Sequence, residues 1–213
     1  PDGAAIQTAI FTQKGCERVM RYAFELARKR KKLGDSPAGL VTNCTKSNAL
    51  NYSMVFWDKV FAQVAQDYPD IKTDMALVDA LTMWMVKNPE YFDVIVASNL
   101  FGDIITDLGA MLQGGMGFAA GANINPEKKY PSMFEPIHGS APKYANKGIV
   151  NPVAAIESIR MMTEHLGQTE ASQDIEAALT QVLQSGNVKT RDMGGKHSTA
   201  EMGDAIKKAL LSP

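Results

Sequence analysis

Two aspartates, Asp103 and Asp107, lie four residues apart in "SNLFGDIITDLGAMLQGG", Ser98 to Gly115. In a helix this spacing places both carboxylates on one face, and their repulsion costs a few tenths of a kcal/mol unless a cation lies between them. Oxygen ligands select hard cations such as Mg²⁺ or Mn²⁺. The pair therefore predicts a divalent metal site, although a solvated acidic helix face has the same spacing and stays an alternative.

Asp79 and Lys46 are two further candidates. Asp79 lies in the apolar segment "LVDALTMWMV", where a carboxylate needs a partner, so it favours a third metal ligand. Three acids without cysteine or clustered histidine argue against zinc. Lys46 lies in "TNCTKSNALN", a polar stretch between an expected strand and helix, where it can act as a general base on a substrate hydroxyl. A surface lysine at a helix start is the alternative.

The first half of the chain must position these side chains. Apolar spacing predicts helices at 15–30, 49–69 and 75–89, with a break at 34–37, and buried strands at 38–43 and 92–98. A further helix is expected from Gly102, which places Asp103 in its first turn near the positive end of the helix dipole. In Met83-Trp84-Met85-Val86, four successive apolar side chains point all round the axis, which indicates an intersubunit helix bundle.

The second half of the chain differs from the first in composition. The stretch 114–126, "GGMGFAAGANINP", is rich in glycine and small residues, so we expect a close backbone approach and a domain crossing there. We expect a strand at 132–136, a loop at 137–144, and helices at 151–167, 171–185 and 199–211, the last with a capping box from Ser198 and Glu201. The glycines match no dinucleotide fingerprint. The loop "HGSAP", 138–142, offers backbone N–H groups that suit a pyrophosphate or ribose.

Composition narrows the class of protein. The chain has 213 residues, of which 45% are hydrophobic, enough for one large or two small domains. Its 22 basic and 23 acidic residues nearly balance, so no net positive charge attracts it to nucleic acid or to an anionic membrane. A small molecule or a protein is therefore the expected partner. Cys16 and Cys44 have no ligand spacing and are expected to be buried thiols. With neither an export signal nor a long apolar run, a cytoplasmic location is expected.

Four segments together resemble one known family: "TKSNALNYS", "NLFGDIITDLGAMLQGGMGF", "FEPIHGSAP" and "GIVNPVAAI". They are similar to the isocitrate/isopropylmalate dehydrogenases, which are metal-dependent, decarboxylating β-hydroxyacid dehydrogenases, and most of all to the tartrate/D-malate branch. The resemblance runs in order from Phe11 to the C-terminus. It implies an α/β, isopropylmalate dehydrogenase-like fold, of which this chain is the C-terminal portion.

The resemblance implies a domain organisation. Residues 1–113 would form the small dimerisation and metal-binding domain, incomplete at its N-terminus, with a dimer bundle around Trp57 and Trp84. Residues 114–213 would form the C-terminal half of the large nucleotide-binding domain. Relatives carry an earlier segment with the arginines that bind substrate carboxylates, the loop that recognises the side group, and half of the nucleotide-domain sheet. We therefore expect apolar surface to be exposed after residue 114.

The resemblance also implies an enzyme whose active site is shared within a homodimer. Asp103 and Asp107 would bind Mg²⁺ or Mn²⁺ from one subunit, and Lys46 and Asp79 would reach over from the other. Lys46 and Asp79 would be catalytic residues, and Asp79 would also be a metal ligand. The reaction would be oxidation, with or without decarboxylation, of a small 2-hydroxy dicarboxylate such as tartrate or D-malate. A 3-isopropylmalate or isocitrate dehydrogenase is the alternative. The alternatives of another class are a non-catalytic dimerisation or regulatory subunit and an inactive fragment. The retained acids argue against the regulatory subunit, which would have no reason to keep them.

The implied cofactor is NADP or NAD. By motif, Asn48 would contact the nicotinamide ribose, and six residues would line the nicotinamide and adenosine sites: Glu135, His138, Gly139, Ser140, Ala141 and Asn151. Lys143 and Tyr144 stand where NAD-dependent members commonly have an acidic residue, and Arg191 stands where NADP-dependent members contact phosphate, so NADP is favoured.

Phe11 replaces the tyrosine that donates a proton in most of the family, which favours a substrate whose oxidation needs no enol protonation.

Overall fold

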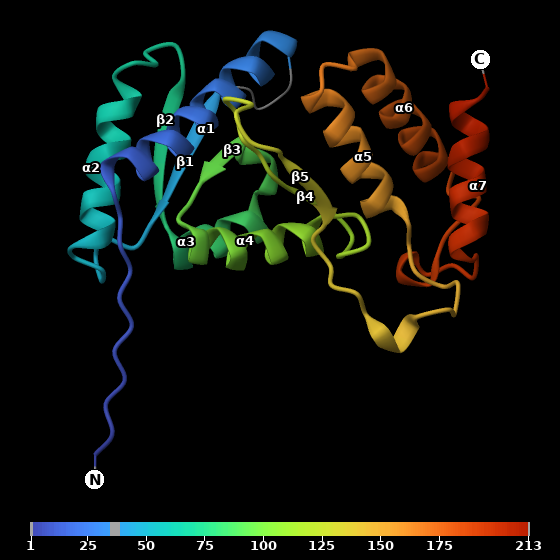
Figure 1. Cartoon of the computed structure of the whole chain (residues 1–213), viewed down its shortest axis with the longest axis horizontal. Coiled ribbons are helices and arrows are strands. Elements are labelled where there is room, and N and C mark those ends of the chain that lie inside the picture. Colours follow the sequence, from blue (N-terminus) through green and yellow to red (C-terminus); the bar gives the residue numbers. More distant parts are fainter. Residues whose placement is uncertain (1, 35–38, 213) are drawn as a thin grey trace. The chain divides into compact units, whose positions relative to one another are not determined.

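The computed structural model describes residues 2–34 and 39–212 (Figure 1). Two compact units divide the chain, Pro1–Leu108 and Gly109–Pro213, called unit 1 and unit 2 below. The helix α1, Gln13–Leu33, begins at Thr12, whose side chain accepts a hydrogen bond from the Gly15 N–H, and ends at Gly34 with φ 80°. Most of the expected break at 34–37 lies outside the described residues.

Unit 1 contains a three-stranded parallel sheet in the order β2-β1-β3. Its strands are β1 Leu40–Thr45, β2 Lys72–Leu77 and β3 Val94–Val96. Between them lie the helices α2, Ser53–Ala65, and α3, Val78–Lys87, and the short 3₁₀ turn η1, Pro89–Tyr91. Since Thr45 pairs with Leu77 and both strands run in the same direction, the residues that follow these strands leave the sheet at one edge.

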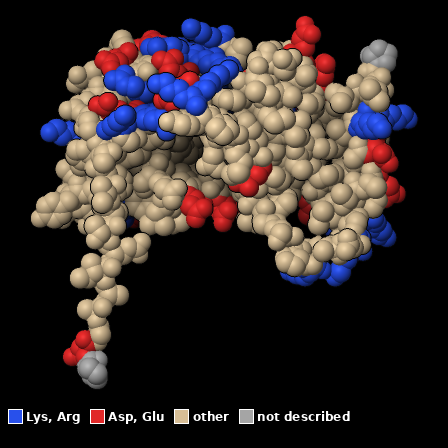
Figure 2. Space-filling view, viewed as in Figure 1, with Lys and Arg blue, Asp and Glu red and all other residues tan. Residues whose placement is uncertain are grey.

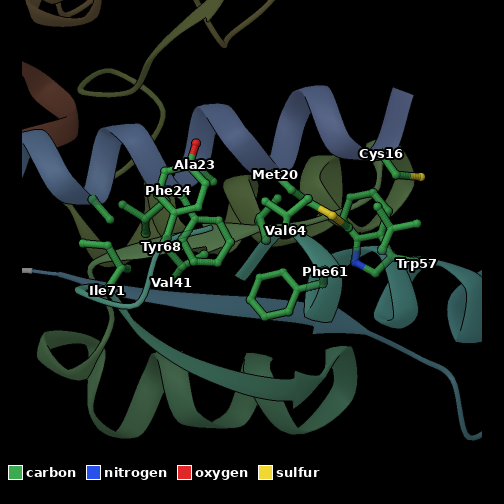
Figure 3. Packing of buried hydrophobic residues seen from close by; sticks show 14 of the residues in the cluster. Cys16, Met20, Ala23, Phe24, Val41, Trp57, Phe61, Val64, Tyr68 and Ile71 are labelled. Atoms are coloured by element: carbon green, nitrogen blue, oxygen red, sulfur yellow. The ribbon is translucent and has the colours of Figure 1, made fainter. Parts of the chain in front are cut away.

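The core of unit 1 fills the space between α1, α2 and the central strand. Figure 3 shows Met20 and Phe24 of α1 facing Val64 of α2 and Val41 of β1. The rings of Phe24 and Tyr68 stack with centroids 4.8 Å apart. These buried side chains hold β1 in place, so the residue that follows β1 leaves a well-packed strand.

The basic run "RKRKK" ends α1, as expected, and it binds the start of the sheet. Arg28 Nη2 lies 2.6 Å from Asp70 Oδ1, before β2, and Arg30 Nε lies 2.5 Å from Asp93 Oδ1, before β3. The Asp93 side chain is fully buried and also accepts a hydrogen bond from the Gly39 N–H, at 2.8 Å. Figure 2 shows Lys and Arg side chains gathered over this end of α1. Their charges are thus used within unit 1.

Two expectations about unit 1 are wrong in detail. Met75 to Leu77, predicted as the start of a helix, belong to β2, because their backbone groups pair with β1; the apolar run "MALVDAL" suits either structure. The helix α4, Asn99–Leu112, begins three residues before Gly102. Asp103 therefore lies in the second turn, where the helix dipole contributes less than in the first.

Unit 2 combines a short antiparallel hairpin with three helices. The strands β4, Ala120–Asn123, and β5, Met133–Pro136, pair with each other and pack against α5, Val153–His165. The helices α6, Thr169–Ser185, and α7, Thr199–Leu210, complete it, with 3₁₀ turns η2, Pro142–Tyr144, and η3, Arg191–Met193. The capping box of Ser198 and Glu201 is confirmed. The strand β4 was not expected, since its sequence "AGAN" has low strand propensity.

The predicted close backbone approach is found at Gly117, where an added Cβ would lie 2.7 Å from Asp192 Oδ2 and 2.9 Å from Asn151 Cβ. Apolar side chains are also exposed in unit 2, among them Met133 at 50% and Ile159 at 48%. In the ranges described, no helix has the length and apolar character needed to cross a membrane.

Cys16 and Cys44 are free, buried thiols, as predicted. Burial raises the pKa of the Cys44 thiol to about 11, so only about 0.1% is thiolate at pH 8, and thiolate is the reactive form. We expect Cys44 to resist alkylation in the native protein and to react fully in denaturant. Peptide mapping after a short iodoacetamide pulse at pH 8 measures this. Labelling of native Cys44 at the denatured rate would contradict its position.

Candidate active site

Lys46 and Asp79 form an ion pair at the carboxyl edge of the unit 1 sheet, with Lys46 Nζ 2.7 Å from Asp79 Oδ1. The register explains the pair, because Lys46 follows Thr45 and Asp79 comes two residues after Leu77, the residue opposite Thr45. The Lys46 side chain is 24% exposed and that of Asp79 is 65% exposed. One charged partner is therefore accessible to a ligand and the other is held close to the sheet.

The hydrogen bond from Lys46 lowers the pKa of Asp79, and the backbone N–H of Asp79 at the start of α3 lowers it further. A lowered pKa means that the attractive pair is complete above the usual carboxyl range and is lost as pH falls through the lowered value. Asp79 is thus a carboxylate at neutral pH. As expected for a carboxylate in an apolar segment, Asp79 has a partner, Lys46. Leu81 and Met85 of the same helix point into the core, and Asp79 points outward.

Asp103 and Asp107 lie on the outer face of α4. The same helix turns Ile105, 5% exposed, into a cluster with Leu81 and Met85 of α3. Both carboxylates are exposed, and in the part of the chain that the structure describes neither has an ion-pair partner. Two unneutralised carboxylates one turn apart suit a hard divalent cation. Over the described ranges, however, no three His, Cys, Asp or Glu side chains come together as a metal site, so within one chain this pair has no third such ligand beside it.

The outer faces of α3 and α4 are unusually apolar. Met83 is 71%, Trp84 46% and Val86 61% exposed on α3, and Leu100 is 64% and Ile104 51% exposed on α4. A soluble monomer rarely exposes so many neighbouring apolar side chains. The acidic pair and this apolar surface therefore share a helix.

Trp57 does not contribute to that surface. It is 3% exposed, and its indole N–H donates to Asn43 Oδ1 at 2.6 Å. The Trp57 side chain packs inside unit 1, because α2 turns this face toward α1 and the sheet. The exposed surface comes from α3, as predicted around Trp84, and from α4.

In unit 2, the loop 137–147 carries most of the predicted cofactor residues. Glu135 is exposed at the end of β5, and His138, Gly139 and Ser140 follow it. Within the described ranges, the backbone N–H groups of 139–141 meet no protein acceptor. Ala141 has φ 42° and ψ 61°, a left-handed conformation that costs a non-glycine residue about 1 kcal/mol or more. Strained backbone of this kind is enriched at active sites and ligand-binding segments. The loop thus presents free donors on a strained backbone.

Lys143 and Tyr144 lie together on η2. Lys143 Nζ is 4.9 Å from the centre of the Tyr144 ring, and Lys147 Nζ is 6.0 Å from it. All three residues are exposed. Lys147 was not predicted, although its position four residues after Lys143 was a signal in the sequence. Two ammonium groups around one phenol suit an anionic ligand.

The other predicted cofactor residues lie in different settings. Asn48 is exposed in the turn 47–49 that follows Lys46 in unit 1, and Arg191 is exposed on η3 in unit 2. Asn151 is only 6% exposed. It differs from the others in having its side chain turned into the protein.

Comparison with known proteins identifies the family. The model of the isocitrate/isopropylmalate dehydrogenases matches residues 1–206. The chain belongs to this family. It is 51% identical over 209 residues to a probable tartrate dehydrogenase/decarboxylase of Bacillus subtilis (strain 168), covering 98% of this chain and 57% of that protein. It is 45% identical over 211 residues to the D-malate dehydrogenase [decarboxylating] of Escherichia coli (strain K12), and this match covers 97% of this chain and 56% of that protein.

The fold agrees with this assignment. The crystal structure of isocitrate dehydrogenase from Methylococcus capsulatus matches with a TM-score of 0.89 and 41% sequence identity, over 96% of this chain and 58% of that one. The predicted family, its tartrate/D-malate branch and the α/β, isopropylmalate dehydrogenase-like fold are confirmed. The chain spans a little over half the length of the curated relatives it matches.

In this member of the isocitrate/isopropylmalate dehydrogenase family, Phe11 is partly buried and packs edge-on against Trp57, with ring centroids 6.2 Å apart and planes at 83°. Phenylalanine has no proton to donate. Phe11 therefore serves packing in this chain, and its correspondence to a family tyrosine stays a prediction.

Proposed function

We propose that the chain belongs to a homodimeric dehydrogenase that oxidises a small 2-hydroxy dicarboxylate, such as tartrate or D-malate, with NADP or NAD and Mg²⁺ or Mn²⁺. The observation that carries the proposal is the Lys46–Asp79 pair, since the parallel strands place a potential base and its carboxylate partner together at an accessible sheet edge. The printed names of the similar enzymes support the substrate class. A cytoplasmic location is part of the proposal.

We further propose that two copies pack through the exposed apolar faces of α3 and α4. Residues 1–113 would then act as the dimerisation and metal-binding domain, and residues 114–213 as part of the nucleotide-binding domain. Each chain offers two carboxylates on α4 and a third, Asp79, at the sheet edge. A dimer would complete the ligand set if the α4 pair of one copy faced Asp79 and Lys46 of the other. Burial of Trp84 and its neighbours would stabilise the pairing.

Each residue would then have a defined role. Asp103, Asp107 and Asp79 would hold the metal, which when bound lowers the pKa of the substrate hydroxyl and polarises the product carbonyl. Lys46, as the neutral amine, would accept the hydroxyl proton as hydride leaves for the nicotinamide, and Asp79 would stabilise the ammonium that forms, as it does in the observed ion pair. The free N–H groups of 139–141 would bind the nucleotide. With Phe11 in place of a tyrosine, protonation of an enol would depend on another donor.

Calorimetric titration with Mn²⁺ tests the function in the complete gene product that carries these 213 residues. We expect Mn²⁺ uptake that tartrate or D-malate strengthens, and reduction of NADP or NAD that requires both metal and hydroxyacid. Stronger turnover of 3-isopropylmalate or isocitrate would change the substrate and keep the mechanism. No metal uptake with any of these acids would exclude the catalytic proposal.

The exposed cluster of Lys143, Tyr144 and Lys147 supports NADP over NAD. We expect Lys143→Asp to shift the ratio of specificity constants toward NAD by about ten- to a hundredfold, because a charge-assisted hydrogen bond to the 2′-phosphate is worth roughly 1.5–3 kcal/mol. Steady-state kinetics with both cofactors measures the ratio. Lys129→Asp, the same charge reversal on another exposed loop, serves as the control. An unchanged ratio would mean that Lys143 does not contact the cofactor.

A further inference from the structure

Asn151 closes the loop that carries the proposed nucleotide site, and both ends of its side chain are bound within the protein. Its Oδ1 accepts a hydrogen bond from the Val153 N–H at 3.0 Å, at the start of α5. Its Nδ2 donates to Asp192 Oδ2 at 2.9 Å. With 6% exposure, the amide has little surface left for a ligand.

Asp192 connects three segments that are distant in sequence. Besides the bond from Asn151, its Oδ1 accepts a hydrogen bond of 2.5 Å from the hydroxyl of Thr190, which is fully buried. Its Oδ2 lies against Gly117, where a Cβ would be 2.7 Å away. Gly117 in turn accepts a hydrogen bond from the Ala154 N–H at 2.9 Å. The carboxylate therefore sits where η3, α5 and the glycine-rich stretch meet.

The segment 189–199, which carries Asp192, is closely packed on itself and also contacts residues 148–150 of the loop. Gly195 N–H donates to Thr190 O, and its Cα approaches Lys189 so closely that a Cβ would clash with the Lys189 carbonyl. Thr199 N–H donates to Gly148 O at 2.8 Å, and the Thr199 hydroxyl donates to Val150 O at 2.5 Å. The hydrogen bond between Asp192 and Asn151 adds a side-chain contact to these attachments of the loop.

We propose that Asp192 is a positioning residue for cofactor binding, which fixes the loop 137–151 through Asn151, and that Asn151 supports the loop instead of touching the nucleotide. The inference rests on the proposed function for its consequence, because the loop presents the N–H groups of 139–141 and the side chains of Lys143 and Tyr144. It assigns Asn151, which the family resemblance placed in the cofactor site, a role inside the protein. Arg191 is held by the same link, since it precedes Asp192 on η3.

An exchange of the two side chains tests the link. In Asn151→Asp, two carboxylates face each other where a hydrogen bond was, and we expect the dissociation constant for NADP to rise about tenfold or more, with kcat little changed. In the double variant Asn151→Asp/Asp192→Asn, the new amide at 192 can donate to the carboxylate at 151 and still accept from the Thr190 hydroxyl. We expect this variant to return to within about threefold of the original affinity.

Hydrogen exchange of the backbone amides at 148–154 gives a second readout that needs no cofactor. We expect exchange to accelerate about tenfold in Asn151→Asp and to recover in the double variant. Asn187→Asp, the same substitution in an exposed turn after α6, is the control and should change neither readout. The complete gene product is used throughout.

The two readouts separate the failure of the inference from that of the function. Unchanged exchange in Asn151→Asp, or no recovery in the double variant, would overturn the link. Recovered exchange with affinity still lost would show that the Asn151 amide contacts the nucleotide, which would overturn its supporting role. If the original protein bound neither NADP nor NAD, the proposed function would fail, and the exchange measurements would still decide the link.

Discussion

Replacing Lys46 by alanine is expected to lower kcat by about 10²- to 10⁴-fold, the range by which a positioned general base accelerates proton transfer. The expectation follows from its place one residue after a strand with neighbours on both sides, 2.7 Å from Asp79. Steady-state kinetics with saturating metal, cofactor and tartrate or D-malate measures it. The KM for the hydroxyacid should change much less than kcat, because removing the base leaves the metal ligands in place.

Lys59→Ala is the matched control, since Lys59 is an exposed lysine on α2 of the same unit. It should retain full activity. Exogenous small amines should restore part of the activity of Lys46→Ala by entering the space of the lost side chain. A Lys46→Ala enzyme with more than a tenth of the original kcat would exclude Lys46 as the base.

Asp103→Asn is expected to lower the affinity for Mn²⁺ by about tenfold or more, because it removes one of the two charges that α4 presents to the cation. Without metal, the same substitution should leave the fold intact and raise the free energy of unfolding by a few tenths of a kcal/mol, since it relieves the repulsion with Asp107. These opposite signs distinguish a metal site from an ordinary surface pair. Calorimetry measures the affinity, and denaturant unfolding with and without metal measures the stability.

Asp204→Asn on α7 is the control, an exposed helical aspartate in unit 2. It should leave metal affinity unchanged. If Asp103→Asn and Asp204→Asn behaved alike, the α4 pair would be a solvated acidic face.

The two variants together test whether the site is shared. In a heterodimer of Lys46→Ala with Asp103→Asn, one of the two sites combines an intact Lys46 from one copy with an intact Asp103 from the other. Mixing and reassembling equal amounts should therefore restore about a quarter of the original activity, since half of the randomly paired dimers are mixed and each has one good site. Mixing that restores no activity, with subunit exchange verified by mass, would place each site within one chain.

The structure shows which parts of the site could be predicted from sequence. The helix with Asp103 and Asp107, the strand before Lys46 and the capping box of α7 followed from local patterns of apolar spacing and capping residues. The start of α4 was misplaced by three residues because Asn99 and Leu100 can begin a helix as readily as Gly102 can. Residues 75–77, the second half of β2, were predicted as helix because the pairing with β1 is not visible in the segment itself.

Contacts between segments that are distant in the chain could not be predicted from local sequence patterns. Nothing near Asn151 indicates that its amide meets Asp192, 41 residues later, and motif comparison alone assigned it to the cofactor. Likewise, the apolar segment around Asp79 indicated that the carboxylate needs a partner, but it did not indicate that the helix turns the apolar neighbours inward and leaves Asp79 exposed beside Lys46. Local composition predicts which residue types are present, and the packing of separate elements decides what each side chain meets.

Lys46 and Asn48 differ in how firmly the fold of unit 1 holds their backbone. Lys46 directly follows a strand whose neighbours fix it on both sides, whereas Asn48 lies in an exposed turn attached by two backbone hydrogen bonds to the Lys46 carbonyl. Residues 47–52 can therefore be lengthened, shortened or exchanged without displacing the lysine, while a one-residue insertion within 40–45 would turn every later side chain of the strand to the other face. For anyone seeking a variant with altered ligand preference, the turn is the part of this edge to randomise, and the strand is the part to leave untouched.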